Sequence, residues 1–315
     1  MMTKSKVVIV GTGFVGMSYA YALLNQGVVE ELVLVDVNKE KAEGEAMDLN
    51  HGLAFAPRKM LIKAGDYSEC KDAGLVVITA GVSQKPGETR IDLLNRNATI
   101  IKAVTRSVMD SGFDGIILVA SNPVDILTYV AWKESGLPSS RVLGSGTSLD
   151  TARLRFQISK YIQIDSRNIH AYIMGEHGDS EFVCWSKAYI GAKPMSDVIE
   201  SMDEINFEDL EKIYVNVRDS AQQIIQKKKA TYYGIGMALV RITSALFNNE
   251  NRIMPVSVYN DGVYNIEKDL YIGLPAVLNR DGVHHVVNLK LSDSEQEKLE
   301  KSAAILKSNL DQMTI

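Results

Sequence analysis

The feature that most constrains the fold is a glycine-rich turn between an apolar run and a helical segment near the N-terminus. Residues 7–10 (VVIV) lead directly into residues 11–16 (GTGFVG). Gly11 would permit a tight turn, Gly13 would let the backbone approach a bound phosphate, and Gly16 would let the helix pack closely on the strand. Such a turn opens a strand–turn–helix unit whose helix N-terminus attracts anions.

An acidic residue completes this pattern. Asp36 lies twenty residues after Gly16 and directly follows a second apolar run at residues 32–35 (LVLV). A carboxylate at this position accepts a hydrogen bond from the ribose 2′-hydroxyl of a dinucleotide and repels a 2′-phosphate, so the expected cofactor is NAD rather than NADP. The alternative is a glycine turn in the same type of fold without a bound nucleotide.

The composition excludes several classes of protein. The chain has 315 residues, 46% of them hydrophobic, which is enough for a large core in two domains. Its 34 basic and 39 acidic residues provide no overall attraction to nucleic acid or to an anionic membrane. Cys70 and Cys184 lie far apart without a metal-binding spacing, which favours buried thiols and a cytoplasmic location and predicts no metal site.

The uncharged stretch 7–29 permits a second interpretation, a secretory signal or a membrane span. Glycines and the polar pair Asn25 and Gln26 interrupt this stretch. Cleavage within it would remove the glycine turn, and Asp36 would then have no dinucleotide site to complete. A buried strand followed by a buried helix accounts for the same residues. We therefore expect a chain without a membrane partner.

Short apolar runs alternate with helical segments through the first half of the chain. The predicted buried strands are residues 7–10, 32–35, 75–79 and 116–119, and the predicted helices between them are residues 14–26, 39–49 and 91–111. This alternation is typical of an α/β fold in which a doubly wound parallel sheet (a Rossmann fold) carries helices on both faces. Ligands of such sheets bind beyond the C-terminal ends of the strands.

From about residue 143 the pattern changes and predicts an α+β second domain. The expected helices are residues 149–161, 207–228, 234–247 and 292–310, and the expected strands are residues 169–174, 253–259, 271–278 and 284–289, with a hairpin turn at 279–282. Ser292 and Glu295 have the spacing of a capping box. The predicted division is residues 1–145 for the dinucleotide and residues 146–315 for the substrate. His284 and His285, adjacent in a strand, should point to opposite faces and bind no metal.

Three further segments carry candidate chemistry. His177 lies in residues 175–179 (GEHGD), and an imidazole exchanges protons near neutral pH. Residues 81–90 (GVSQKPGETR) form a long polar segment at the ligand edge of the sheet, suited to a mobile lid that ends at Arg90. Asp150 and Arg153 share one helix face. Taken singly, each has a structural alternative: a hydrogen-bonded histidine, a flexible loop and an intrahelical ion pair.

Together, and in this order, these residues resemble the L-lactate dehydrogenase family. The matching positions are Gly11, Gly13, Gly16, Asp36, residues 87–90 (GETR), Asn122 with Pro123, Asp150, Arg153 and residues 175–179. The resemblance extends from residue 6 essentially to the end of the chain. It implies an NAD-dependent oxidoreductase that transfers a hydride reversibly between NADH and pyruvate, with lactate as the product.

The resemblance also implies a role for each side chain at the site. His177 would be the proton donor and acceptor, and Asp150 would orient its ring and favour the imidazolium. Arg153 would clamp the substrate carboxylate with its planar fork. Arg90 would polarise the reacting carbonyl after the lid closes. Asn122 would bond the same oxygen or the catalytic ring.

Substrate choice is expected to depend on Gln84 and Thr231. In the similar malate dehydrogenases the position of Gln84 carries an arginine that pairs with a second carboxylate, so the neutral amide favours a monocarboxylate such as pyruvate. Thr231 would line the pocket around the methyl group, with Ile235 nearby on the cofactor side. Malate or a branched 2-hydroxy acid stays open as an alternative substrate. A non-catalytic NAD-binding structural or sensing module is the alternative from another class, although the expected catalytic side chains are all present.

Arg155 and His170 suggest regulation. In bacterial lactate dehydrogenases that respond to fructose 1,6-bisphosphate, the matching positions hold arginine and histidine, which contact phosphate across a subunit interface. Both are present here. The resemblance therefore implies a homotetramer in which cations of paired subunits repel one another until a bisphosphate neutralises them. The alternative is a surface arginine and a histidine that fills a strand position.

Overall fold

The computed structural model describes residues 5–82, 87–201 and 206–313. Its centre is a nine-stranded sheet in the order β14-β13-β12-β6-β5-β4-β1-β2-β3. Six of these strands come from the first half of the chain and pair in parallel. They are β1 (Lys6–Val10), β2 (Glu31–Val35), β3 (Leu61–Ala64), β4 (Leu75–Ile78), β5 (Ile116–Val119) and β6 (Val142–Gly144).

Helices lie on both faces of this parallel sheet, so its strands are mostly apolar and β1, β4 and β5 are completely buried. The helices of the first half are α1 (Phe14–Gln26), α2 (Lys39–His51), α3 (Arg90–Asp110) and α4 (Val124–Ser135). The predicted doubly wound α/β fold is confirmed. Its strands β3 and β6 and its helix α4 were not predicted, because they are short or lie next to Gly and Pro signals that resemble loops.

The second half of the chain extends the same sheet. Its antiparallel strands are β12 (Arg252–Asn260), β13 (Leu270–Asn279) and β14 (Gly282–Val286). β12 joins β6 where Ser257 lies opposite Gly144, and a Cβ at Gly144 would lie only 2.9 Å from that of Ser257. One apolar core therefore continues from the parallel strands to the antiparallel ones. The division at residue 145 stays a prediction.

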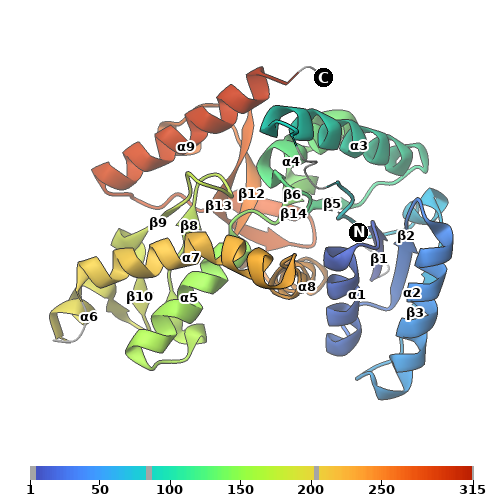
Figure 1. Ribbon diagram of the computed structural model, residues 1–315, viewed down its shortest axis with the longest axis horizontal. Coiled ribbons are helices and arrows are strands. Elements are labelled where there is room, and N and C mark those ends of the chain that lie inside the picture. The colour runs from blue at the N-terminus through green and yellow to red at the C-terminus, as the bar shows by residue number, and fades with distance from the viewer. Residues whose placement is uncertain (1–4, 83–86, 202–205, 314–315) are drawn as a thin grey trace.

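The remaining elements of the second half are helices around two small sheets. The helices are α5 (Ser148–Ile162), α6 (Met195–Ser201), α7 (Phe207–Lys228), α8 (Tyr233–Phe247) and α9 (Asp293–Asp311). One sheet has the order β11-β10-β7, with β7 (Ile169–His170), β10 (Tyr189–Ile190) and β11 (Lys193–Pro194), and the other pairs β8 (Ile173–Met174) with β9 (Phe182–Val183). Figure 1 shows α1, α2 and β1–β3 at one end of the molecule, α5, α6 and β10 at the other, and α8 between them.

Two local predictions for the second half are wrong. The expected strand 169–174 is two short strands that belong to different small sheets. His284 and His285 do not point to opposite faces, since their ring centroids lie 5.0 Å apart. The cause is a β-bulge: the register shifts between Val277 and Leu278, which breaks the alternation of side chains on β14.

Other expectations agree with the structure. Ser292 and Glu295 form the predicted capping box of α9. Cys70 and Cys184 are free and buried, and burial raises the pKa of each thiol to about 12, so neither is a reactive thiolate. Within the described ranges, no helix combines the length and the apolar composition that a membrane crossing requires.

Candidate active site

The glycine turn at the start of α1 leaves backbone and space for a ligand. Gly11 has a φ of 106°, which favours glycine. A Cβ at Gly16 would lie 2.0 Å from the carbonyl oxygen of Gly11, so only glycine permits this packing, whereas a Cβ at Gly13 would have no neighbour within 4 Å. α1 also lacks a side-chain cap and an acidic residue in its first turn. The amide groups of that turn are therefore available to phosphate oxygens.

Asp36 is held at the end of β2 by three hydrogen bonds. Its Oδ2 accepts from the backbone N–H of Thr12 at 2.7 Å and from the Thr12 hydroxyl at 2.9 Å, and its Oδ1 accepts from the N–H of Asn38 at 2.9 Å. Burial opposes ionisation, but these bonds and nearby Lys41 keep the pKa of Asp36 below its usual value. Oδ1 retains a lone pair for a ribose hydroxyl. The residues of this end of the site fit NAD.

The β4 and β5 ends form the adjoining edge of the sheet. The hydroxyl of Ser121 donates to the carbonyl of Ala80 at 2.6 Å, and the side chain of Asn97 accepts the N–H of Val82 at 2.9 Å. Asn122 is exposed on this edge, before a cis peptide bond to Pro123. This position agrees with a ligand-facing role for Asn122.

Helix α8 brings the second half of the chain against the glycine turn. A Cβ at Gly236 would lie 2.9 Å from the backbone of Ser18, and the ring of Tyr232 stacks on that of Phe14 with centroids 5.1 Å apart. The link between α7 and α8 therefore lies beside the first turn of α1. It holds Thr231, which is half-buried, and Ile235 follows in the first turns of α8.

His177 lies in the turn between β8 and β9, and the backbone of this turn is fixed at three points. Gly175 exchanges two backbone hydrogen bonds with Gly273 of β13. The N–H of Glu176 donates to the hydroxyl of Ser302 on α9 at 2.7 Å. The N–H of His177 donates to Asp125 of α4 at 2.8 Å. Three separate elements thus determine where the imidazole lies.

Asp150 joins the imidazole to the guanidinium. Its Oδ2 lies 2.6 Å from Nδ1 of His177, and its Oδ1 accepts from Arg153 at 2.9 Å. The Asp150 side chain is 4% exposed, that of Arg153 13% and that of His177 24%. Asp150 raises the pKa of His177 to about 9, against the opposing effect of burial. Burial likewise favours protonated Asp150, but His177 and Arg153 outweigh it and lower its pKa.

This arrangement can bind an organic anion and protonate it. His177 carries a proton at neutral pH, and because its Nδ1 faces Asp150, its Nε2 is the nitrogen left for a substrate. Arg153 uses one nitrogen for Asp150 and keeps further donors for a carboxylate. His177 and Arg153 keep the Asp150 carboxyl ionised, so the three side chains together form one charged unit.

The described residues include only the end of the proposed lid. Arg90 is the first residue of α3, and Thr89 caps that helix through a capping box with Asp92. The position of the Arg90 side chain is not described, and Gln84 lies outside the described residues. The cap fixes where the segment 81–90 ends in the fold.

The candidate regulatory residues lie together on α5 and β7. Arg155 donates from Nε to the carbonyl of Ala171 at 3.2 Å, one residue after exposed His170. Its guanidinium also lies 5.5 Å from the ring centroid of Tyr172. Burial and then the like charge of Arg252 lower the pKa of Arg155. Within the described part of the chain, no carboxylate lies in ion-pair distance of Arg155.

Three residues at the site were missed by the sequence analysis. Asp125 and Ser302 hold the backbone of the histidine turn, and Glu181 lies in that turn with a carboxyl close to Asp150 and His177. Asp125 follows Asn122 by three residues, and Glu181 follows His177 by four. Their nearness to predicted residues was the available signal. Ser302, on a helix more than a hundred residues later, offered none.

Asp150, His177 and Glu181 form the one group among the described residues whose atoms are close enough to share a metal ion, all within 4.8 Å. The positive charge of Arg153, 2.9 Å from Asp150, opposes a cation there, and Nδ1 of His177 is already committed to Asp150. A shared proton satisfies the same atoms at less electrostatic cost. We propose no metal at this site.

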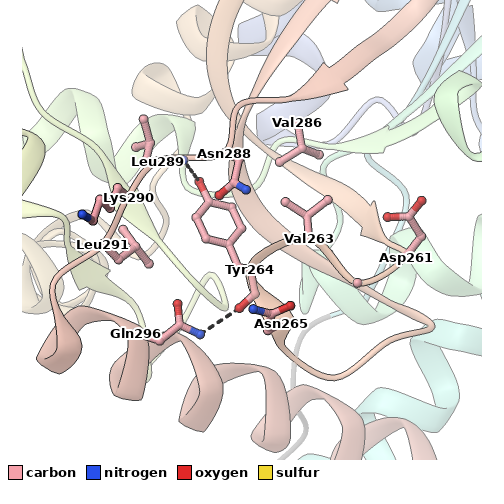
Figure 2. Close-up of a pocket in the computed structure, with 11 residues that line it drawn as sticks. Asp261, Val263, Tyr264, Asn265, Val286, Asn288, Leu289, Lys290, Leu291 and Gln296 are labelled. Atoms are coloured by element: carbon pink, nitrogen blue, oxygen red, sulfur yellow. Dashed lines mark hydrogen bonds between the residues drawn. The ribbon is translucent and has the colours of Figure 1, made fainter.

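A separate hollow of about 660 Å³ lies between the β12–β13 connection, the segment after β14 and the start of α9. Figure 2 shows Tyr264 at its centre, with the side chain of Gln296 donating to the Tyr264 carbonyl. The Tyr264 hydroxyl donates to the carbonyl of Val287 and accepts the N–H of Leu289. None of the predicted site residues lines this hollow, and its central side chain is already fully hydrogen-bonded.

Comparison with known proteins agrees with this geometry. Residues 5–144 match the family model of the lactate/malate dehydrogenase NAD-binding domain, and residues 147–314 match that of the lactate/malate dehydrogenase α/β C-terminal domain. An L-lactate dehydrogenase of Geobacillus sp. is 60% identical over 303 residues, which are 96% of this chain and 95% of the relative. An L-lactate dehydrogenase 2 of Bacillus cereus is 56% identical over 97% of both chains.

Solved structures give the same result. A lactate dehydrogenase from a deep-sea metagenome library of the Medee basin is 74% identical over 99% of both chains, with a TM-score of 0.98. The ligand-bound minor L-lactate dehydrogenase of Enterococcus mundtii is 50% identical over 99% of both chains, with a TM-score of 0.97. The chain belongs to the lactate/malate dehydrogenase family of NAD-dependent oxidoreductases.

Proposed function

We propose that this protein is an L-lactate dehydrogenase that reduces pyruvate with NADH and oxidises lactate in the reverse direction. The observation that carries the proposal is the buried Asp150 carboxylate, bonded at once to His177 and to Arg153. A 2-keto acid needs both partners, a cation for its carboxylate and a proton donor for its keto oxygen. The names of relatives at 56–60% identity support lactate over malate.

Each residue has a defined task in this reaction. Arg153 binds the pyruvate carboxylate and fixes the orientation of the keto group. NADH, when bound, supplies the hydride that the keto carbon receives. Nε2 of His177 gives its proton to the keto oxygen, and the resulting neutral imidazole regains a proton from solvent. In lactate oxidation the same nitrogen accepts the hydroxyl proton, while Asp150 stabilises the imidazolium that forms.

The other predicted residues have expected tasks around this centre. Arg90 polarises the keto oxygen after the lid closes, and Asn122, at the exposed end of β5, bonds the same oxygen or the imidazole. Thr231 lines the pocket for the methyl group, and Ile235 lies toward the nicotinamide. Gln84 offers no positive charge to a second carboxylate. These roles favour a small monocarboxylate.

Steady-state oxidation of NADH with pyruvate, oxaloacetate and 2-ketoisocaproate tests the substrate. We expect the highest kcat/KM with pyruvate. A clear preference for oxaloacetate would assign the chain to malate instead, and a preference for 2-ketoisocaproate would indicate a branched-chain 2-hydroxy acid dehydrogenase. Absence of turnover with all three would favour the alternative, a non-catalytic NAD-binding module.

We also propose activation by fructose 1,6-bisphosphate in a homotetramer. Supporting observations are the position of Arg155 next to Arg252 without a carboxylate partner among the described residues, and exposed His170 one residue before the Arg155 acceptor. A pair of subunits would bring twice as many such cations together, and two phosphates would relieve their repulsion. The proposed location is the cytoplasm, where this metabolite and NADH are available.

Pyruvate saturation curves at pH 6 and pH 7.5, with and without the bisphosphate, test this regulation. We expect the bisphosphate to lower the pyruvate concentration needed for half-maximal rate. Arg155→Gln should remove the response while retaining reduction of pyruvate at high concentration. Identical curves with and without the bisphosphate at both pH values would refute the regulatory role, and sedimentation at assay concentration checks the tetramer.

A further inference from the structure

Glu181 is a buried acid in the catalytic turn for which the mechanism above has no task. It precedes β9, and its residue exposure is 5%. Its backbone N–H bonds to Gly178, and its carbonyl accepts the hydroxyl of Tyr214 on α7. One carboxyl oxygen of Glu181, one of Asp150 and one ring nitrogen of His177 lie within 4.8 Å of one another.

Two carboxyls this close in a buried site do not both ionise readily, because their charges repel and neither is well solvated. Asp150 is the ionised member, since it accepts from both His177 and Arg153. Glu181 has no cation of its own in the described structure, and Arg153 bonds to Asp150 instead. Burial and the Asp150 charge raise the pKa of Glu181 to about 9. A protonated Glu181 can donate a hydrogen bond to the Asp150 carboxylate, whereas an ionised Glu181 can only accept one.

The charged and titratable groups that face Glu181 come from three elements. α5 contributes Asp150 and Arg153, the turn itself contributes His177, and α7 contributes Tyr214. Burial and then Glu181 raise the pKa of the Tyr214 phenol to about 12, so it is neutral. On α4, Asp125 accepts from the backbone N–H of His177 and from the Ser257 hydroxyl, and burial raises its pKa to about 6. No facing group therefore takes a proton from Glu181 at neutral pH.

We propose that Glu181 is a positioning residue that remains protonated at neutral pH, donates its proton to Asp150 in a hydrogen bond, and thereby keeps the substrate pocket positive. With His177 protonated, the charges of Asp150, Arg153, His177 and neutral Glu181 leave one net positive charge. An ionised Glu181 would cancel it, and the pocket would lose its attraction for the carboxylate of a 2-keto acid. This inference rests on the proposed function, in which that carboxylate binds Arg153.

A consequence is that two protons, rather than one, control the loss of activity at alkaline pH. His177 and Glu181 titrate as a coupled pair, and loss of either proton removes the state that binds and protonates the substrate. In Glu181→Gln the amide still donates to Asp150 but cannot ionise, so His177 titrates alone. The native enzyme should therefore lose activity more steeply with rising pH than the variant.

The kinetic test is log kcat/KM for pyruvate against pH from 6 to 10.5, with each enzyme normalised to its own value at pH 7. We expect the native slope to approach two protons above pH 9 and that of Glu181→Gln to stay near one. At pH 10 the normalised variant should exceed the native enzyme by roughly three- to tenfold. Glu297→Gln, an exposed acid on α9, is the matched control and should follow the native profile. Equal slopes in the native enzyme and Glu181→Gln would overturn the inference.

An infrared measurement tests protonation without turnover. A protonated carboxylic acid has a carbonyl stretch that a carboxylate lacks. At pH 7.5 Asp125 is ionised, so we expect the band in the native protein and its absence in Glu181→Gln; it should fade as the pH rises through about 9. If the variant does not fold, the native pH titration alone decides, and no band at pH 7.5 overturns the inference. A band in a protein that reduces none of the three keto acids would support the protonation and reject the proposed function.

Discussion

The dinucleotide end and the catalytic end of the active site differ in what they are made of. Apart from Asp36, the first offers backbone and open space: a Cβ at Gly13 would have no neighbour within 4 Å, and the first turn of α1 carries no acidic residue. The second consists of charged side chains, with Asp150 4% exposed and Arg153 13%. A dinucleotide can be bound by amides that are already in place, whereas proton transfer requires a titratable group whose environment is controlled. The two ends should therefore respond differently to substitution.

The largest effect is expected from His177→Asn, which removes the proton-transferring side chain of the catalytic end and leaves the dinucleotide end unchanged. Asparagine does not exchange a proton at neutral pH, so kcat should fall by about 10²–10⁴-fold. Binding of NADH should persist, because its phosphates are held by α1 and not by this turn. Steady-state kinetics and NADH fluorescence titration measure the two quantities. Turnover near the native rate would remove His177 from the mechanism.

The next effect distinguishes two glycines at the dinucleotide end. Gly16→Ala places a methyl group 2.0 Å from the Gly11 carbonyl, and relief of this clash should cost about 1–3 kcal/mol of unfolding free energy without any ligand. Gly13→Ala is the matched control for folding, because its methyl group enters open space. Gly13→Ala should leave Tm unchanged and weaken the binding of NADH. Calorimetry with and without NADH measures both, and equal behaviour of the two variants would contradict separate roles.

The contrast between the two ends also explains what the sequence alone could predict. Gly11, Gly13, Gly16 and Asp36 lie within one β1–α1–β2 unit, so their spacing along the chain fixes their spacing in space. The catalytic end draws on α4, α5, α9 and the β8–β9 turn, and only the family resemblance joined Asp150 to His177. Ser302 and the protonation of Glu181 depend on tertiary contacts that no local pattern encodes.

The same limit appears in the fold. Four of the six parallel strands, β1, β2, β4 and β5, were predicted from their apolar runs, since both faces of that sheet are buried. The extension of the sheet by β12 depends on a single pairing of Ser257 with Gly144, far apart in sequence. The bulge that turns His284 and His285 together depends on how β13 pairs with β14. Both are properties of strand register, which side-chain alternation within one strand does not determine.

A smaller effect should appear as a pH dependence of stability at the catalytic end. The pKa of His177 is about 9 in the folded state, above its ordinary value of 6.5. Its protonation therefore stabilises the fold fully below pH 6.5, and this stabilisation is lost as the pH rises through 9. The native protein should exceed His177→Asn by roughly 2 kcal/mol more at pH 6 than at pH 9.5. Urea unfolding at both pH values measures it, and a constant difference would refute the raised pKa.

The smallest effect concerns the support of the catalytic turn by α9. The buried Ser302 hydroxyl accepts the N–H of Glu176 at 2.7 Å and contacts that of Ser180 at 2.9 Å. Ser302→Ala leaves that N–H without its partner, so unfolding free energy should fall by about 1 kcal/mol and kcat by a few-fold as the imidazole loses its fixed position. Ser308→Ala, on the exposed side of the same helix, is the matched control.

In Ser302→Ala the unfolding free energy and kcat must both fall for this interpretation to hold. If Ser302→Ala lowers stability but leaves kcat and its pH profile at native values, α9 supports the fold and not the catalytic geometry. If both change while NADH binding does not, the effect is confined to the end of the site that depends on buried side chains. Because the Ser302 hydroxyl bonds to none of Asp150, Arg153 and His177, a change in kcat would show that the backbone of the turn, and not only its charges, sets the position from which His177 transfers its proton.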